Sequence, residues 1–476
     1  MEKQTITKAT RREHDLLGYR DVPEAAYYGI HTLRALENFP ISGDPISKYP
    51  ELVTALVDIK QAAALTNCEL GLLDQMRCDA IVEACHAIRN GALAEHFAVD
   101  LIQGGAGTST NMNANEVVCN KALEILGRPR GDYAFLHPNE HVNMSQSTND
   151  VYPTALRIAT YRSAMRLLDR MASLESSFEK KSAEFRELLK VGRTQLQDAV
   201  PMTLGQEFAT YAVMLNEDRQ RLGETLPLIS EINLGATAIG TGINAHPDYA
   251  VLVRQHLCDV SGLPLHTAPY LVEATQDCGA FVQFSGVLKR IGVKLSKVCN
   301  DLRLLSSGPR SGFGEINLPA VQAGSSIMPG KVNPVIPEVM NQVAFEVIGN
   351  DVTITMAAEA GQLQLNAFEP VIAYSLFRSI EHLTQACITL DERCVRGITA
   401  NADHMRDMLD RSIVLVTALN PYIGYANSTE VAREALETGR KVADIVLERG
   451  LLSADMLREI LRPEVLTAPR APVALR

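Results

Sequence analysis

The chain has 476 residues, a formal net charge of −11 and 46% hydrophobic residues. Its length is enough for about three domains and a large core, while its acidic balance argues against nucleic acid or an anionic membrane as a partner. The nine cysteines include no C-x-x-C pair, which is typical of reduced thiols inside a cell. We find no signal peptide and no apolar run long enough to span a bilayer, and we expect a cytoplasmic protein.

The first 147 residues mix helical patterns with polar loops, and we predict that they form an N-terminal domain. Residues 103–113, with the sequence QGGAGTSTNMN, combine a glycine-bearing turn with hydroxyl and amide side chains. A second polar segment, Ser145–Asp150, places hydroxyls where they could cap a following helix. Taken alone, each segment is more typical of a turn or helix cap than of a binding site.

The stretch from His137 to His141 has the H-x-x-E-H spacing of one class of zinc peptidases. That chemistry requires both histidines on one face of a helix. Pro138 followed by Asn139 favours a turn instead, so we predict no zinc site here.

The middle of the chain, residues 148–403, carries the clearest fold signal. Residues 154–191 contain neither Gly nor Pro and repeat apolar side chains every three or four positions, which predicts a helix of roughly 50 Å or more. From Phe284 to Leu305 the apolar spacing alternates between four and three, a pattern typical of helices packed nearly parallel to a neighbour. We therefore predict an all-α fold with a central bundle of five long helices, the others at 206–232, 336–360 and 369–397.

The last segment, residues 404–476, breaks into short helices that end at Gly439 and Gly450, and we predict a small C-terminal domain. Between Thr429 and Arg462 acidic residues slightly outnumber basic ones. A helix-turn-helix that reads DNA should present a basic face, so a packing or regulatory role is favoured. Because the five long helices carry apolar surface on more than one side, we also expect oligomerisation.

Residues 324–334, with the sequence GSSIMPGKVNP, carry the most chemical information in the chain. The glycines allow a ligand to approach the backbone, Lys331 and Asn333 offer donors for a carboxylate, and Ser325 or Ser326 could act as a nucleophile or base. The segment is not a phosphate-binding loop, because five residues separate its glycines and a valine follows the lysine. It predicts a site for an anionic small molecule.

These three polar segments resemble, in the same order, the signature regions of the fumarase/aspartase superfamily. Its members add or eliminate ammonia, water or a similar group across the double bond of fumarate. Residues 192–201 (GRTQLQDAVP) are similar to a further family loop, and Gly104–Ser109 and Gly235–Gly242 most resemble the aspartase branch. The similarity runs from Tyr27–Arg34 to the C-terminal helices. It implies a small dicarboxylate substrate and a homotetramer with a twenty-helix core, in which subunits share their active sites.

The resemblance also implies a reaction and its residues. The expected reaction is reversible anti elimination of ammonia from L-aspartate through an enediolate. The catalytic serine lies six residues before the lysine, at Ser325, on a mobile loop between Leu305 and Pro334. The expected substrate-binding residues are Thr108, Ser147, Thr148, Asn149, Thr194, Gln195, Ser326, Lys331 and Asn333. Neither an organic cofactor nor a catalytic metal is implied, and activation by a divalent metal such as Mg²⁺ is left open.

Position 195 bears on the choice between ammonia and water. Fumarases carry histidine there, paired with a glutamate that Glu338 matches, whereas Gln195 does not titrate and cannot act as a base. Some aspartases also carry histidine, so this residue disfavours a fumarate hydratase without singling out an aspartase. The alternatives are a hydratase of the same superfamily and a non-enzymatic helical assembly. The retained Ser325, Lys331 and Asn333 argue against the second.

Overall fold

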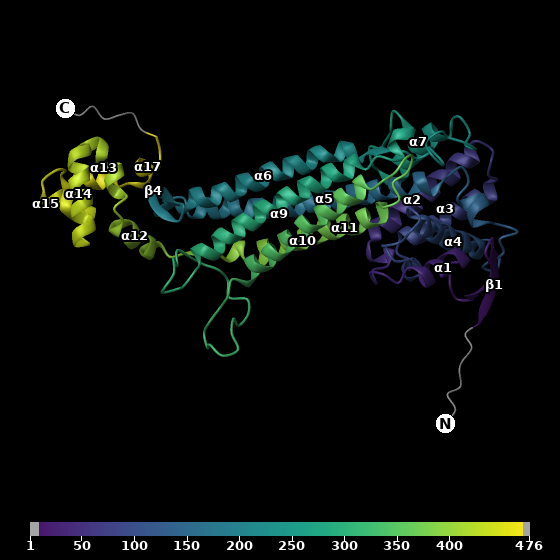
Figure 1. The fold of residues 1–476 in the computed structure, drawn as a ribbon, viewed down its shortest axis with the longest axis horizontal. Coiled ribbons are helices and arrows are strands. Elements are labelled where there is room, and N and C mark those ends of the chain that lie inside the picture. Colours follow the sequence, from purple (N-terminus) through teal and green to yellow (C-terminus); the bar gives the residue numbers. More distant parts are fainter. Residues whose placement is uncertain (1–8, 470–476) are drawn as a thin grey trace, which may run out of the picture. The chain divides into compact units, whose positions relative to one another are not determined.

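The computed structural model describes residues 9–469, which are mainly helical (Figure 1). The five predicted long helices are confirmed. Between Phe284 and Leu305 every residue of the predicted apolar seam is buried. The long helices are α5 (Thr148–Glu184), α6 (Leu204–Ile229), α9 (Gly279–Leu305), α10 (Val335–Glu359) and α11 (Glu369–Arg393).

The other elements are short. The strands in the described range form four two-stranded pairs, of which only β5–β6 is parallel. None of the helices in that range is both long and apolar enough to cross a membrane. The strands are β1 (Thr10–Asp15), β2 (Gly18–Pro23), β3 (Leu189–Thr194), β4 (Gln197–Thr203), β5 (Glu231–Ile232), β6 (His266–Thr267), β7 (Ile316–Asn317) and β8 (Thr399–Ala400). The remaining α-helices are α1 (Ile30–Asn38), α2 (Pro50–Glu69), α3 (Gln75–Arg89), α4 (Thr108–Ile125), α7 (Tyr249–Ser261), α8 (Leu271–Ala274), α12 (Ala402–Arg411), α13 (Leu415–Ile423), α14 (Tyr425–Thr438), α15 (Val442–Glu448), α16 (Ala454–Ile460) and α17 (Pro463–Leu466).

The contacts between residues divide the chain into two compact units. Each of the five long helices contributes residues to both. The division into three domains at residues 147 and 403 stays a prediction. The first unit contains the described residues up to Leu168, Arg221–Arg290 and Glu346–His382, and the second contains Asp169–Gln220, Ile291–Phe345 and the described residues from Leu383 on.

In the first unit, α2 packs against α3, α4 and α7. Glu116 of α4 is buried and accepts hydrogen bonds from the backbone N–H groups of Gly29, His31 and Thr32. These N–H groups belong to the start of α1, where a helix leaves its donors unpaired. The carboxylate therefore caps α1 and fixes it on α4.

The start of α5 lies six residues before the predicted one and includes Pro153. Proline cannot donate to the carbonyl four residues earlier, so it normally weakens a helix. Here that carbonyl, of Asn149, accepts a 3.0 Å hydrogen bond from Asn233 Nδ2. A side chain from a distant loop thus replaces the missing backbone donor and allows the helix to begin earlier.

The predicted end of the same helix, at residue 191, is wrong. Helix α5 ends at Glu184, and Leu189 and Val191 belong to β3. Both side chains are buried in an apolar cluster built largely from the C-terminal helices, including Leu415 and Leu419 of α13. The apolar spacing therefore predicted correctly which side chains are buried, but packing against the C-terminal helices favours a strand over a continuation of the helix.

Polar side chains link the long helices within the second unit. Glu175 of α5 accepts hydrogen bonds from Asn216 and Arg219 of α6.

Farther along the chain, α14 and α15 end just before Gly439 and Gly450, as predicted. Both glycines have positive φ, of 70° and 63°, which is the usual glycine conformation at a helix end.

Candidate active site

Helix α4 starts with its first turn pressed against α5. Gly107 precedes the helix with φ 88°, and a Cβ there would lie 2.3 Å from the ring of Tyr152. Only glycine satisfies both conditions. Thr108, the first residue of α4, is exposed, and its Oγ1 donates a 2.7 Å hydrogen bond to the carbonyl of Gly105.

The start of α5 presents three consecutive half-buried polar side chains, Ser147, Thr148 and Asn149. Ser147 Oγ accepts from the backbone N–H of Asn149 at 3.2 Å, and Thr148 Oγ1 accepts from Asn111 Nδ2 at 3.1 Å. Each hydroxyl therefore uses its oxygen as an acceptor, which leaves its proton for another partner. Asn149 Nδ2 donates to the carbonyl of Ala238 at 2.6 Å, so the Oδ1 of the same side chain points away from that carbonyl.

Asp150 holds the aspartase-like segment Gly235–Gly242 beside these residues. Its carboxylate accepts from the backbone N–H groups of Gly235 and Thr237 at 3.1 and 2.8 Å, and from that of Ser147 at 3.0 Å. Burial raises the pKa of Asp150 to about 7, against the effect of these three donors. The carboxyl group thereby fixes both the loop and the start of α5.

Lys60 of α2 is fully buried next to the start of α5. The sequence analysis did not predict it as a site residue. Its Nζ donates to Asn111 Oδ1, Asn143 Oδ1 and Gln146 Oε1 at 2.7, 3.0 and 2.8 Å. Burial lowers the pKa of the amine to about 7. A signal was present in the sequence, because Asp58 and Lys60 are two charges inside an otherwise largely apolar stretch of helix.

The segment expected to be a mobile loop begins after α9 and is interrupted by β7. From residue 318 to residue 334 it has no helix or strand. The loop is closed by hydrogen bonds from Gly324 N to Lys331 O, at 2.9 Å, and from Asn333 Nδ2 to Gly324 O, at 2.8 Å. A Cβ on Gly324 would lie 2.5 Å from the Lys331 carbonyl, so this close approach requires glycine.

Ser325 is half-buried within this loop, and its Oγ accepts from the backbone N–H groups of Ile327 and Met328 at 3.2 and 3.0 Å. Ser326 and Lys331 are exposed. No ion pair joins the Lys331 ammonium to any carboxylate among residues 9–469. The side chain of Ile327, on the same loop, is 83% exposed.

Residues 194 and 195 lie at the tip of the β3–β4 hairpin. Thr194 ends β3, and Gln195 and Leu196 form the two-residue turn, with φ of 54° and 63°. Positive φ at both positions is typical of a type I′ turn, which favours Asn and Gly. Glutamine and leucine are strained there, and both are exposed.

The predicted site residues thus form two groups, one in each unit. In the first unit, the structure brings Ser147, Thr148 and Asn149 to the start of α5, beside the start of α4 with Thr108. In the second unit, Thr194 and Gln195 lie on the hairpin. Its Arg193 forms a 2.6 Å ion pair with buried Glu315, which precedes the loop that carries Ser325, Ser326, Lys331 and Asn333.

The His137–His141 stretch does not form a regular α-helix: a single turn of π-helix runs from Pro138 to Val142, and His137 precedes it. His137 Nδ1 accepts from the backbone N–H of Asn139, and His141 Nδ1 accepts from that of His137. Burial lowers the pKa of both imidazoles. Within the described range, three or more His, Cys, Asp or Glu side chains nowhere gather closely enough to hold a metal.

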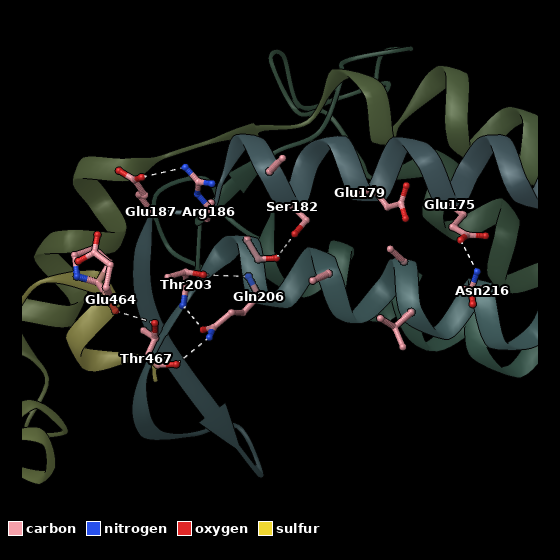
Figure 2. A pocket seen from close by; sticks show the side chains of 16 residues that line it. Glu175, Glu179, Ser182, Arg186, Glu187, Thr203, Gln206, Asn216, Glu464 and Thr467 are labelled. Atoms are coloured by element: carbon pink, nitrogen blue, oxygen red, sulfur yellow. Dashed lines mark hydrogen bonds and ion pairs between the residues drawn. The ribbon is translucent and has the colours of Figure 1, made fainter. Parts of the chain in front are cut away.

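A cavity of about 860 Å³ lies elsewhere in the second unit, between α5, α6 and α17 (Figure 2). Figure 2 shows Gln206 bonded to Thr203 and Thr467 at one end and Glu175 bonded to Asn216 at the other. None of the predicted site residues lines it. This cavity is therefore separate from the candidate active site.

Over most of its length the chain matches families of lyases. Residues 18–349 match the family described as Lyase, and residues 415–468 match Fumarase C C-terminus. The chain therefore belongs to the fumarase/aspartase superfamily, as its motifs predicted. It is 61% identical to the aspartate ammonia-lyase of Pseudomonas fluorescens, over 97% of this chain and 96% of that protein.

Two solved structures share the fold. One is the fumarate lyase:delta crystallin of Brucella melitensis bound to cobalt, with a TM-score of 0.94 and 56% identity, covering 97% of this chain and 100% of that one. The other is the class II fumarase of Schistosoma mansoni, with a TM-score of 0.90 and 35% identity, covering 96% and 98%.

Proposed function

We propose that this protein is an aspartate ammonia-lyase, which reversibly eliminates ammonia from L-aspartate to give fumarate. The observation that carries the proposal is the 61% identity to the Pseudomonas fluorescens enzyme over nearly the whole of both chains. The reaction is an anti elimination. A base removes a proton beside the β-carboxylate, an enediolate forms, and ammonia then leaves.

Ser325 acts as the base. A serine hydroxyl is a poor base unless its oxyanion is stabilised, and hydrogen bonds to a charged form favour that form. The two backbone N–H groups that already point at Ser325 Oγ, from Ile327 and Met328, support this role. Closure of the loop would add exclusion of water and the nearby charge of Lys331.

The hydroxyls of Thr108, Ser147 and Thr148 stabilise the negative charge that develops on the β-carboxylate. Ser147 and Thr148 suit this task because their oxygens are already bonded as acceptors and their protons are not. Thr108 must exchange its bond to the Gly105 carbonyl for one to the substrate. These donors add no fixed charge and serve the transition state more than the ground state.

Lys331 and Asn333 hold the α-carboxylate, and Asn149 and Thr194 orient the amino group. Asn149 suits the second role, because its Nδ2 is bonded to the Ala238 carbonyl and its Oδ1 is left to accept from an ammonium. Ser326 and Gln195 complete the substrate contacts from the loop and the hairpin. The chemistry needs no organic cofactor or catalytic metal, since ammonium leaves without further acid catalysis.

The working enzyme is a cytoplasmic homotetramer whose subunits share active sites. Support comes from α10, where the large apolar side chains of Phe345, Val352 and Met356 are 63%, 55% and 66% exposed in the single chain. Their spacings of seven and four place them on one face of the helix. Such a stripe is typical of a surface that another helix covers.

The first test follows fumarate by its ultraviolet absorbance after purified protein receives L-aspartate or, separately, L-malate. We expect fumarate from aspartate only, and its loss in Ser325→Ala by at least about 100-fold in kcat. Ser326→Ala is the matched control on the same loop and should lose much less.

The outcome also tests the main alternative, a fumarate hydratase. The observation behind this alternative is the 35% identity to the Schistosoma mansoni fumarase. Fumarate mainly from malate would establish the hydratase despite Gln195. No product from either substrate would contradict both activities.

A further inference from the structure

Each N–H bond of the buried Lys60 ammonium has its own hydrogen-bond acceptor. The ammonium has three N–H bonds, and the structure surrounds it with three amide oxygens, from Asn111, Asn143 and Gln146. Its bonding partners are all neutral; the carboxyl of Asp150 and the thiol of Cys85 influence it only through space. In its protonated form the amine has three donors and cannot accept a hydrogen bond, so all three amides turn their oxygen toward Lys60.

The orientation of Asn111 has a consequence for a predicted substrate contact. With Oδ1 toward Lys60, its Nδ2 faces outward and donates to Asn143 Oδ1 and to Thr148 Oγ1, both at 3.1 Å. The Thr148 hydroxyl must then be an acceptor at this contact. No acceptor for its proton lies within hydrogen-bond distance in the part of the chain that the structure describes.

We propose that Lys60 is a positioning residue that acts through Asn111 to set the direction of the Thr148 hydroxyl, so that its proton faces the carboxylate of the substrate. The inference rests on the proposed function, in which Thr148 stabilises the enediolate. Without the cation, the Asn111 amide could turn over and present Oδ1 to Thr148. The Thr148 hydroxyl would then donate to Asn111 Oδ1, and its lone pairs would face the negatively charged enediolate.

A set of double variants tests this coupling. Lys60→Met is combined with Thr148→Val, which removes the hydroxyl, and with Thr148→Ser, which keeps it. We expect Lys60→Met to lower kcat/KM by about 100-fold or more beside Thr or Ser at position 148, as for loss of one preorganised donor. Beside Val it should cost less than about threefold, since the hydroxyl on which Lys60 acts is gone. An equal loss in all three backgrounds would overturn the proposal.

Asn111→Asp tests the same link if Lys60→Met fails to fold. The carboxylate keeps a partner for Lys60 but replaces the donor that faces Thr148 by an acceptor, so the hydroxyl must reverse. Asn143→Asp is the matched control, because it places an equal charge beside Lys60 without touching Thr148. We expect Asn111→Asp to lower kcat/KM at least about tenfold more than Asn143→Asp. Equal losses would contradict the inference.

Binding of succinate, measured by calorimetry, separates this inference from the proposed function. Wild-type protein that binds succinate but makes no fumarate would contradict the activity, and the same variants could still be compared by affinity. The inference then requires Lys60→Met to weaken succinate binding beside Thr or Ser at position 148, but not beside Val. Wild-type protein with neither binding nor turnover would overturn both proposals.

Discussion

At the scale of single residues, Glu369 couples folding to pH. It lies in the first turn of α11 and is buried, and the charge of Arg157 acts on it through space. Burial raises the pKa of its carboxyl from 4.5 to about 8. Since the folded pKa is the higher one, the fold favours the protonated form. The contribution of this group to stability is complete below pH 4.5 and is lost as the pH rises toward 8.

The variant Glu369→Gln imitates the protonated side chain at every pH. We expect the melting temperature of the wild type to fall relative to that of the variant as the pH rises from about 5 to about 8.5. Glu437→Gln, at an exposed position of α14, controls for the change in net charge. A wild type that instead gains stability over the variant with rising pH would mean that Glu369 is ionised in the fold and paired with Arg157.

At the scale of elements, the junction of α4 and α5 depends on Gly107. Its φ of 88° disfavours any side chain, and a Cβ would overlap the ring of Tyr152. Gly105→Ala is the matched control, because Gly105 has a φ of 89° but open space, with its nearest atoms 3.8 Å from a Cβ. Comparing the two substitutions separates backbone strain from steric overlap.

We expect Gly105→Ala to cost about 1 kcal/mol of stability. Gly107→Ala should cost about 1–3 kcal/mol more, because Tyr152 must move. It should also lower activity, since the shift carries Thr108 away from the start of α5. Chemical denaturation measures the first effect and fumarate production the second. Equal costs for the two substitutions would mean that the α4–α5 contact adjusts freely.

At the scale of the whole molecule, shared active sites predict complementation between inactive subunits. Ser325→Ala and Thr108→Ala subunits are mixed in equal amounts, unfolded and reassembled. If the two residues enter a site from different subunits, random assembly leaves about a quarter of the sites intact. Mixing Ser325→Ala with Lys331→Met is the control, because both lie on one loop and no site can be restored. Well-folded mixed oligomers without activity would contradict shared sites.

Much of the molecule could be predicted from local sequence. The apolar repeat from Phe284 to Leu305 determined α9, because a helix buries positions at fixed intervals whatever its partner is. The loop around Ser325 and Lys331 was equally recognisable, since its glycines, hydroxyls and cation serve no core. Local composition and periodicity therefore determined the five long helices and the character of the loop.

Tertiary structure decided the rest, because the deciding partners are distant in sequence. Asn233 supplies the donor that lets α5 include Pro153. The C-terminal helices turn Leu189 and Val191 from a predicted helix into a strand. Lys60 likewise becomes part of the site only when α2, α4 and the start of α5 meet around it. Local sequence indicated which side chains would be buried or polar, and only packing decided what each one faces.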